Sequence, residues 1–161
     1  MTATATTTHA FHVRLADWAQ DRAQLQAVRE AVFVREQNIP AELEWDEAVD
    51  RTCIHVLALD HANRPIGTAR LKPDGQIGRM AVLAPWRRRG VGRTLLDALL
   101  AVAREHRIDA LWLNAQAHTM GFYIQLGFRP TGEPFHEAGI VHRRMIHTAA
   151  TAEDPPTHAR A

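Results

Sequence analysis

The sequence of 161 residues has one cysteine, no long apolar run and a net charge of only +1. The lone Cys53 excludes an internal disulfide framework and is compatible with a reducing compartment. No apolar run approaches the length that a bilayer-spanning helix needs, and the N-terminus lacks a basic segment followed by an apolar one. These absences predict a cytoplasmic protein without a membrane partner.

The near-neutral balance of charge excludes a global basic field of the kind that holds nucleic acid. Positive charge is concentrated between Arg87 and Arg93, and this local cluster suits a small polyanion better than a duplex. The length predicts one domain with a substantial core, over residues 9–147. Residues 1–8 are expected to form a flexible N-terminus, and the polar residues 148–161 a disordered C-terminal tail.

Hydrophobic periodicity and turn residues predict alternating strands and helices along this domain. The expected strands are residues 11–15, 53–59, 66–71, 76–83, 108–114, 128–131 and 139–146, and the expected helices are residues 18–36, 94–106 and 117–126. The strands within 53–83 follow one another through turns, which predicts an antiparallel meander. The helix at 94–106 separates two strands, which predicts a parallel pair joined by a crossover. The sequence therefore predicts a mixed α/β (α+β) fold.

The most informative stretch runs from Gln76 to Leu100 and joins an apolar strand, a basic loop and a leucine-rich helix. Gly90 and Gly92 remove side chains where the backbone must approach another group closely. The loop also brings free backbone N–H groups and the positive end of a helix dipole to one point, and such points bind phosphate. Neighbouring arginines add charge-assisted donors. The stretch therefore predicts a phosphate-binding loop.

Two common phosphate loops do not fit this stretch. A Walker A loop needs a lysine after its last glycine, and the dinucleotide fingerprint needs a third glycine where Leu95 stands. The remaining pattern is R-x-x-G-x-G, from Arg87 to Gly92. It resembles the acetyl-coenzyme A (acetyl-CoA) loop of the GCN5-related N-acetyltransferase (GNAT) family. A solvated arginine run at a helix start is the alternative interpretation of the loop alone.

Further signals in the family's order lie downstream of the loop. The family has an asparagine at the end of the strand after the phosphate helix, then an aromatic pair and a Gly-Phe turn. Here these are Asn114, Phe122-Tyr123 and Gly127-Phe128.

The resemblance covers residues 53–145, and the segment 28–38 (VREAVFVREQN) is similar to the branch of small acetyltransferases that includes the ElaA-like proteins. The resemblance implies the acyl-CoA N-acyltransferase fold. This fold has a mixed, mostly antiparallel sheet of about six to seven strands flanked by helices, with a central strand pair that splays apart.

The resemblance implies transfer of an acetyl group from acetyl-CoA to a primary amine on a small molecule or a protein, without a metal. Backbone groups of Met80, Ala81 and Val82 would meet the pantetheine arm, and Asn114 would contact the pantetheine or the loop. Arg87 fills the family's Arg/Gln position. The backbone amides that would hold the pyrophosphate are those of Arg88, Arg89, Gly90, Val91, Gly92, Arg93 and Thr94.

The implied reaction is direct attack of the amine on the thioester. Tyr123 falls on the family's acid position and would protonate the leaving thiolate; a core aromatic residue is the alternative interpretation. A backbone N–H near Val82 is the natural donor to the developing oxyanion. The general base has no motif, and its candidates are Glu44, Asp46, Glu47 and His118.

Five acidic residues between Glu42 and Asp50 surround apolar ones. They predict a solvated loop with apolar anchors or, alternatively, an acidic wall that attracts a cationic amine. Histidines are scattered, and the set His136, His142 and His147 lacks the paired spacing of metal ligands.

Two other classes of function remain open. A catalytically silent module of the same fold would bind acetyl-CoA as a sensor. A nucleic-acid module would use the arginine cluster, although the near-neutral charge argues against it. Homodimers are common in this fold, so a homodimer is compatible with the resemblance.

Overall fold

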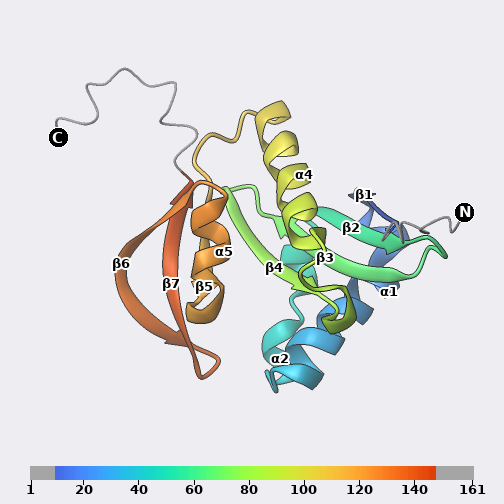
Figure 1. Ribbon diagram of the computed structural model, residues 1–161, viewed down its shortest axis with the longest axis horizontal. Helices are drawn as coiled ribbons and strands as arrows, with labels where there is room; N and C mark the ends of the chain where they lie inside the picture. Colours follow the sequence, from blue (N-terminus) through green and yellow to red (C-terminus); the bar gives the residue numbers. More distant parts are fainter. Residues whose placement is uncertain (1–9, 148–161) are drawn as a thin grey trace, which may run out of the picture.

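Seven strands form one sheet in the order β1-β2-β3-β4-β5-β7-β6, in a computed structural model that describes residues 10–147 (Figure 1). The strands are β1 (Phe11–Ala16), β2 (Ile54–Asp60), β3 (Pro65–Leu71), β4 (Gln76–Val82), β5 (Trp112–Gln116), β6 (Phe128–Glu137) and β7 (Ile140–His147). Neighbouring strands are antiparallel except β4 and β5, which are parallel. The predicted mixed sheet is therefore confirmed. The predicted terminal segments 1–8 and 148–161 lie outside the described residues.

The helices flank this sheet. They are α1 (Trp18–Arg29), α2 (Ala41–Glu44), α3 (Glu47–Asp50), α4 (Val91–Glu105) and α5 (Met120–Gln125), with a π-helical segment η1 (Glu30–Glu36) and short 3₁₀ segments η2 (Ala84–Trp86) and η3 (Ala117–Thr119). The Asp17 carboxylate caps α1 by accepting the Gln20 N–H at 3.0 Å. Because α1 continues directly into η1, the helix predicted over 18–36 has the expected extent but is π-helical in its last part.

One error in the predicted boundaries concerns β5, which was expected over 108–114 and is observed at Trp112–Gln116. The chain first turns out of α4, with Arg107 at φ 56° and the Ile108 N–H donating to the Ala103 carbonyl at 2.8 Å. This turn contains apolar residues, Ile108 among them, and in the sequence they have the pattern of a strand. As a consequence, Asn114 lies in the middle of β5 and not at its end.

Other boundaries also differ from the predicted ones. α4 begins at Val91, before the predicted residue 94, because Gly90 adopts a left-handed φ of 83° and starts the helix there. β6 extends to Glu137, beyond the predicted residue 131, since an irregularity between Thr131 and Phe135 lets pairing resume beyond it. β7 has its expected length and is shifted by one residue.

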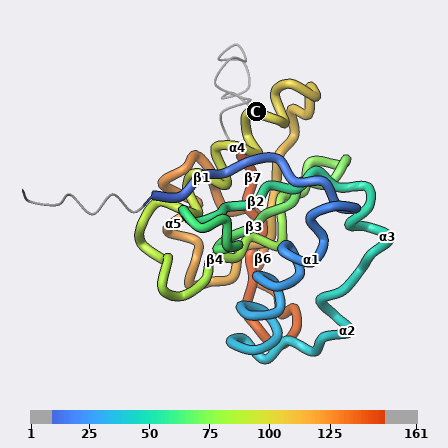
Figure 2. The backbone as a smooth tube through the Cα atoms, turned by 90° about the vertical axis from the view of Figure 1, so that its right-hand side faces the viewer, coloured from blue at the N-terminus to red at the C-terminus, as the bar shows by residue number. Residues whose placement is uncertain are grey.

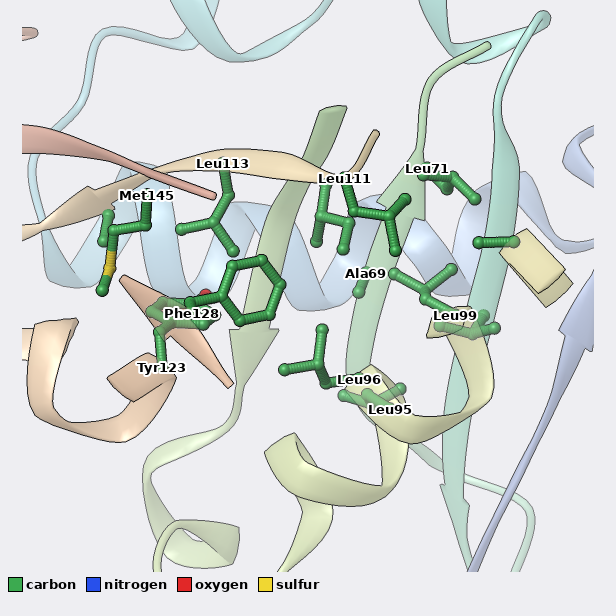
Figure 3. Close-up of a cluster of buried hydrophobic side chains, with 14 of the residues drawn as sticks. Ala69, Leu71, Leu95, Leu96, Leu99, Leu111, Leu113, Tyr123, Phe128 and Met145 are labelled. Carbon is green, nitrogen blue, oxygen red and sulfur yellow. The ribbon is translucent and has the colours of Figure 1, made fainter. Parts of the chain in front are cut away.

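The main core lies between α4, α5 and one face of the sheet (Figure 3). Leu95, Leu96 and Leu99 of α4 are completely buried against the strands. Farther along the same face, Tyr123 of α5 packs with Phe128. The core therefore connects the helix that follows the phosphate loop with the helix that carries the predicted acid.

The opposite face of the sheet is covered by α1 and η1, and α2 and α3 pass along the outer side of α1 (Figure 2). Strand β2 shows how both faces are buried, because Val56 faces the α4 core while its neighbour Leu57 packs with Leu25 of α1. A strand that is buried on both faces has a continuous apolar sequence.

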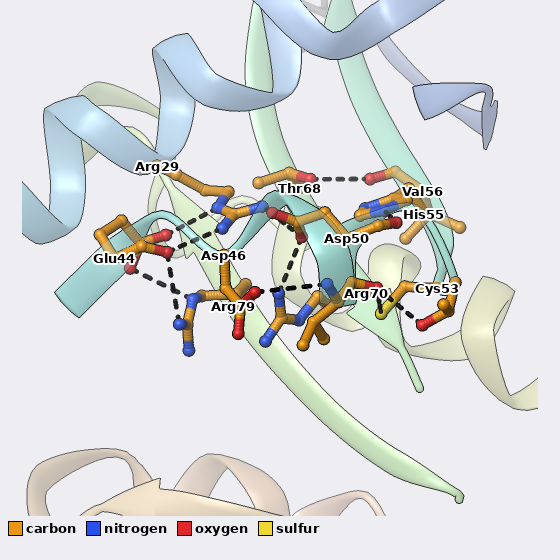
Figure 4. A network of polar contacts seen from close by, with 12 residues as sticks. Arg29, Glu44, Asp46, Asp50, Cys53, His55, Val56, Thr68, Arg70 and Arg79 are labelled. Atoms are coloured by element: carbon orange, nitrogen blue, oxygen red, sulfur yellow. Dashed lines mark hydrogen bonds and ion pairs between the residues drawn. The ribbon is translucent and has the colours of Figure 1, made fainter. Parts of the chain in front are cut away.

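The acidic segment forms α2 and α3 and buries two of its five acids, so the predicted solvated loop is wrong. Glu44 and Asp50 are buried and form ion pairs with three arginines, Arg29, Arg70 and Arg79 (Figure 4). Arg29 Nε lies 2.7 Å from a Glu44 oxygen, and Asp50 Oδ1 lies 2.9 Å from Arg29 and 2.7 Å from Arg70. We name these five residues the ionic cluster.

We expect the ionic cluster and His55 to make the fold sensitive to acid. Burial lowers the pKa of His55, whose Nε2 lies 2.8 Å from the Asp50 carbonyl oxygen, so the unfolded chain binds this proton more readily. The stability contributed by a neutral His55 is therefore complete above about pH 6.5 and declines as the pH falls. Burial alone would raise the pKa of Asp50, but Arg29 and Arg70 hold it below its ordinary value, which adds a second loss below about pH 4.

Urea unfolding at a series of pH values measures this dependence. The free energy of unfolding should fall between about pH 7 and pH 5 in the parent protein, and His55→Gln should flatten that decline. An equally steep decline in the variant would assign the acid sensitivity to other groups.

The turn between β3 and β4 provides a further prediction, because it packs directly on the chain that leads into β5. Gly75 has a φ of 93°, and a Cβ added there would lie 2.0 Å from the Ala110 carbonyl oxygen. We expect Gly75→Ala to lower the free energy of unfolding by about 2 kcal/mol. Gly78→Ala is the matched control, since its Cβ would meet nothing within 4 Å. Equal denaturant midpoints for the two variants would contradict this packing.

Candidate functional site

The parallel strands β4 and β5 pair only at their beginning. Their register has two residue pairs, Gln76 with Trp112 and Ile77 with Leu113. Beyond these pairs the strands diverge, and Figure 1 shows them close at one end and apart at the other. The splayed strand pair that the family resemblance implies is therefore present. An amide-rich ligand can pair with a strand edge that has no neighbouring strand.

A bulge and the antiparallel alternation set the direction of the backbone along the open edge of β4. The register with β3 shifts between Thr68 and Arg70, and Arg79 of β4 has a left-handed φ of 49°. Farther on, the Leu83 N–H donates to the Ile66 carbonyl at 2.9 Å. Since hydrogen-bonded pairs alternate, Val82 directs its N–H and carbonyl away from β3. The Val82 carbonyl already accepts the Arg87 Nε–H at 3.0 Å, which leaves the Val82 N–H as the group available to a ligand.

The loop after β4 has the backbone of an anion site. Arg88 and Gly90 both have positive φ angles, 61° and 83°, and Gly90 starts α4 without a side-chain cap. The first intrahelical bond runs from the Thr94 N–H to the Gly90 carbonyl at 3.0 Å, so the N–H groups of Val91, Gly92 and Arg93 have no intrahelical acceptor. These groups and the dipole of a long helix together favour a phosphate.

The side chains of the loop arginines do not all point to the same partner. Arg87 donates two hydrogen bonds to Glu36 of η1, at 2.7 and 2.6 Å, and these bonds lower the pKa of Glu36. Both side chains are exposed, so the pair adds little stability and mainly holds the loop against η1. Arg89 lies over the ring of Trp86 at 5.2 Å, and Trp86 also meets Phe11 edge to face. Trp86 is therefore a core-edge aromatic residue in this structure.

Tyr123 lies on the inner face of α5, and its hydroxyl is 3.5 Å from the sulfur of Met80 on β4. Burial raises the pKa of Tyr123 to about 12, so the phenol stays protonated at neutral pH. Its ring meets Phe122 and Phe128 edge to face. Phe122 in turn covers Gly92, where an added Cβ would lie 3.3 Å from the Phe122 ring. The structure thus brings Tyr123, β4 and the start of α4 together.

Asn114 carries a polar atom that lacks a partner. Its Oδ1 is buried and accepts no hydrogen bond, and the residue lies opposite Arg144 of β7 in the register. A buried carbonyl oxygen of this kind fits a ligand N–H donor.

The candidate bases have different surroundings. Glu44 belongs to the ionic cluster, and Asp46 caps α3 by accepting the Val49 N–H at 3.4 Å. Glu47 pairs with Arg22 at 2.6 Å and with Arg51 at 3.0 Å. The three carboxylates therefore have structural partners, while His118 is exposed in η3.

Sequence reasoning missed the arginines of the ionic cluster. A signal existed, because Arg29 falls on the apolar stripe of α1 between Val28 and Val32, and Arg70 interrupts the apolar run of β3. A charged residue at a core position requires a buried counter-charge. The reciprocal amide bonds between Gln37 and Gln116, at 3.2 and 2.8 Å, had no such signal.

A sheet with a splayed parallel pair, followed by a glycine-containing loop at the start of a long helix, defines the acyl-CoA N-acyltransferase class of folds. Residues 17–149 match the sequence model of the family described as acetyltransferase (GNAT) domain, so the chain belongs to the GNAT acetyltransferase family.

Individual relatives agree with this membership. The chain is 34% identical to protein ElaA of Escherichia coli over 128 residues, which are 75% of this chain and 83% of ElaA. The ElaA crystal structure matches with a TM-score of 0.76 at 28% identity, over 86% of this chain and 99% of that chain. An uncharacterised N-acetyltransferase of Bacillus subtilis, YjcF, is 37% identical over 123 residues, 74% of this chain and 86% of YjcF.

One similar structure was solved in complex with acetyl coenzyme A. It is a candidate streptothricin acetyltransferase of Bacillus anthracis, 25% identical with a TM-score of 0.53, over 60% of this chain and 62% of that chain. Within residues 10–147 of the present chain, no helix is long and apolar enough to cross a membrane. The same residues contain no group of three or more His, Cys, Asp or Glu side chains that could hold a metal ion.

Proposed function

We propose that the protein is an N-acetyltransferase that uses acetyl-CoA and transfers the acetyl group to an amine, with Tyr123 as general acid. The observation that carries the proposal is the position of the Tyr123 hydroxyl, 3.5 Å from Met80 on the open edge of β4. A phenol with a pKa of about 12 can donate a proton but is not ionised at neutral pH. Family membership and the acetyl-CoA complex of a similar protein support the choice of acyl donor.

The chain offers a complementary group for each part of acetyl-CoA. The N–H groups of Val91, Gly92 and Arg93 suit the pyrophosphate. The unpaired Oδ1 of Asn114 suits an amide N–H of the pantetheine arm. When bound, acetyl-CoA supplies the thioester, which is the activated acetyl group.

In the transfer, a bond forms between the acceptor nitrogen and the acetyl carbon while the carbon–sulfur bond breaks. The amine loses a proton to water or to a base, and the sulfur takes a proton from the Tyr123 hydroxyl. The Val82 N–H would donate to the developing oxyanion. Among the candidate bases, His118 is the one without a structural role in the contacts described above.

Thiol release from acetyl-CoA over a panel of amines tests this function. The panel contains polyamines, aminoglycosides, amino acids and peptide N-termini. We expect at least one class to release thiol about tenfold or more above the rate without amine. A well-folded protein that is protected by acetyl-CoA against thermal unfolding but releases no thiol with any amine would instead be the sensor module.

A further inference from the structure

The ionic cluster has more positive than negative charge. Three guanidinium groups, Arg29, Arg70 and Arg79, face two carboxylates, Glu44 and Asp50. The histidine in contact with the cluster, His55, adds no compensating negative charge, and its burial favours the neutral ring. A partly buried positive charge without a counter-ion is costly, so the cluster is incomplete as it stands.

The surplus charge can be located among the three arginines. Arg29 is fully engaged, with Nε on Glu44 at 2.7 Å, Nη1 on Asp50 at 2.9 Å and Nη2 on the Glu44 carbonyl at 3.2 Å. Arg70 uses Nη1 on Asp50 at 2.7 Å, but its buried Nε has no hydrogen-bond partner. The spare donors therefore lie on Arg70 and Arg79.

Arg79 is the member of the cluster that reaches the surface. Its side chain is 27% exposed, against 1% for Arg29 and 8% for Arg70. Its Nε lies 3.2 Å from Glu44 but outside hydrogen-bonding geometry, and its Nη2 reaches two carbonyl oxygens only at 3.5 and 3.4 Å. Figure 4 shows its guanidinium beside Glu44. Burial, together with the charges of Arg70 and Arg29, lowers the pKa of Arg79, which an added anion would oppose.

The position of Arg79 connects this spare charge to the proposed chemistry. Arg79 forms the bulge of β4, in a left-handed conformation that a non-glycine residue rarely adopts. The next residue is Met80, whose sulfur contacts the Tyr123 hydroxyl. Arg79 reaches Glu44 of α2 while Met80 reaches Tyr123 of α5, so a group bound by Arg79 would lie on the other side of β4 from the proposed proton donor, where β4 and β5 diverge.

We propose that Arg79, supported by Arg70, binds a carboxylate of the amine acceptor, so that the acceptors are amino carboxylates and not polyamines. This assignment rests on the proposed function. It replaces the acidic wall expected from the sequence, because the buried acids of that segment are neutralised by arginines. The planar fork of a guanidinium suits a carboxylate, with which it can form two charge-assisted hydrogen bonds.

Matched pairs of acceptors test the assignment in the parent protein. Glycine, β-alanine and γ-aminobutyrate are each compared with the corresponding carboxamide by thiol release from acetyl-CoA. The amides have less basic amines, so a preference for the acids cannot arise from amine ionisation. We expect kcat/KM for at least one acid to exceed that of its amide by about 10- to 100-fold. Equal values for acid and amide in every pair that turns over would overturn the assignment and leave the proposed function intact.

Variants of Arg79 locate the preference. Arg79→Gln should reduce it to about twofold or less, and Arg79→Lys should retain part of it because the charge remains without the fork. Arg35→Gln is the control, since it removes an equal charge from an exposed side chain of η1. Circular dichroism establishes whether each variant is folded. If Arg79→Gln does not fold, the acid preference of Arg79→Lys is the test. Full preference in a folded variant of Arg79 would contradict the assignment.

Calorimetry separates this assignment from the proposed function. The protein saturated with CoA is titrated with β-alanine and with its amide. If the acid binds, the amide does not, and the Arg79 variants lose the binding, the carboxylate site is supported even when no amine turns over. In that case only the transfer reaction is refuted. If no acceptor turns over and neither compound binds, both proposals are wrong.

Discussion

Replacing Asp50 by alanine should lower the free energy of unfolding by about 3 to 5 kcal/mol, which is a large part of the stability of a small domain. The Asp50 carboxylate is 1% exposed and is shared by Arg29 at 2.9 Å and Arg70 at 2.7 Å. Its removal leaves both buried guanidinium groups without this counter-charge, while Glu44 remains as the single acid of the cluster. Breaking a buried pair costs more than the pair contributes, because the remaining charge stays desolvated.

Urea unfolding at neutral pH measures this loss. Glu47→Ala serves as the control, since Glu47 also pairs with two arginines, Arg22 and Arg51, but at the surface. The control should lose less than about 1 kcal/mol, because water screens exposed ion pairs. Similar losses in the two variants would show that the cluster is not the buried network described here.

Replacing Tyr123 by phenylalanine should lower kcat by about 100-fold and leave the affinity for acetyl-CoA almost unchanged. The ring keeps its contacts with Phe122 and Phe128, so α5 and the core are preserved. The substitution removes only the hydroxyl and its contact with Met80. A selective effect on kcat is the behaviour expected for a group that acts in the transition state.

The pH profile gives a second test of the same residue. Because the pKa of Tyr123 is raised to about 12, the parent activity should show no decline from loss of this proton up to about pH 10. Steady-state kinetics, calorimetry with acetyl-CoA and thermal unfolding of parent and variant complete the comparison. An unchanged kcat in a folded Tyr123→Phe protein would remove Tyr123 from the mechanism and leave it as a core aromatic residue.

The parts of the fold that could be predicted from the sequence depend on short-range patterns. The meander β2-β3-β4 follows from apolar runs separated by turns, and α4 follows from its leucines. The placement of Tyr123 beside β4 follows from the family resemblance, because nothing local in the sequence connects Tyr123 with Met80, 43 residues away. The roles assigned to the loop and to Asn114 stay predictions until a ligand is bound.

The acidic segment shows where sequence reasoning failed. Glu44 and Asp50 have the local pattern of surface charges, and their burial depends on Arg29 and Arg70, which lie 15 and 20 residues away from their partners. Secondary-structure propensity and hydrophobic periodicity contain no information about such long-range ion pairs. The informative signal is an arginine on the apolar stripe of a helix, because a buried arginine needs a buried acid. The same ionic cluster contains Arg79, on which the proposed class of acceptor depends.

Calorimetric titration of the protein with acetyl-CoA tests the central claim most directly, namely that the backbone between Arg88 and Thr94 holds the diphosphate and directs the acetyl group toward Tyr123. The account predicts saturable heat for one site per chain, a raised melting temperature, and weakening of both by excess inorganic pyrophosphate. A well-folded protein that gives neither heat nor thermal protection with saturating acetyl-CoA would contradict it.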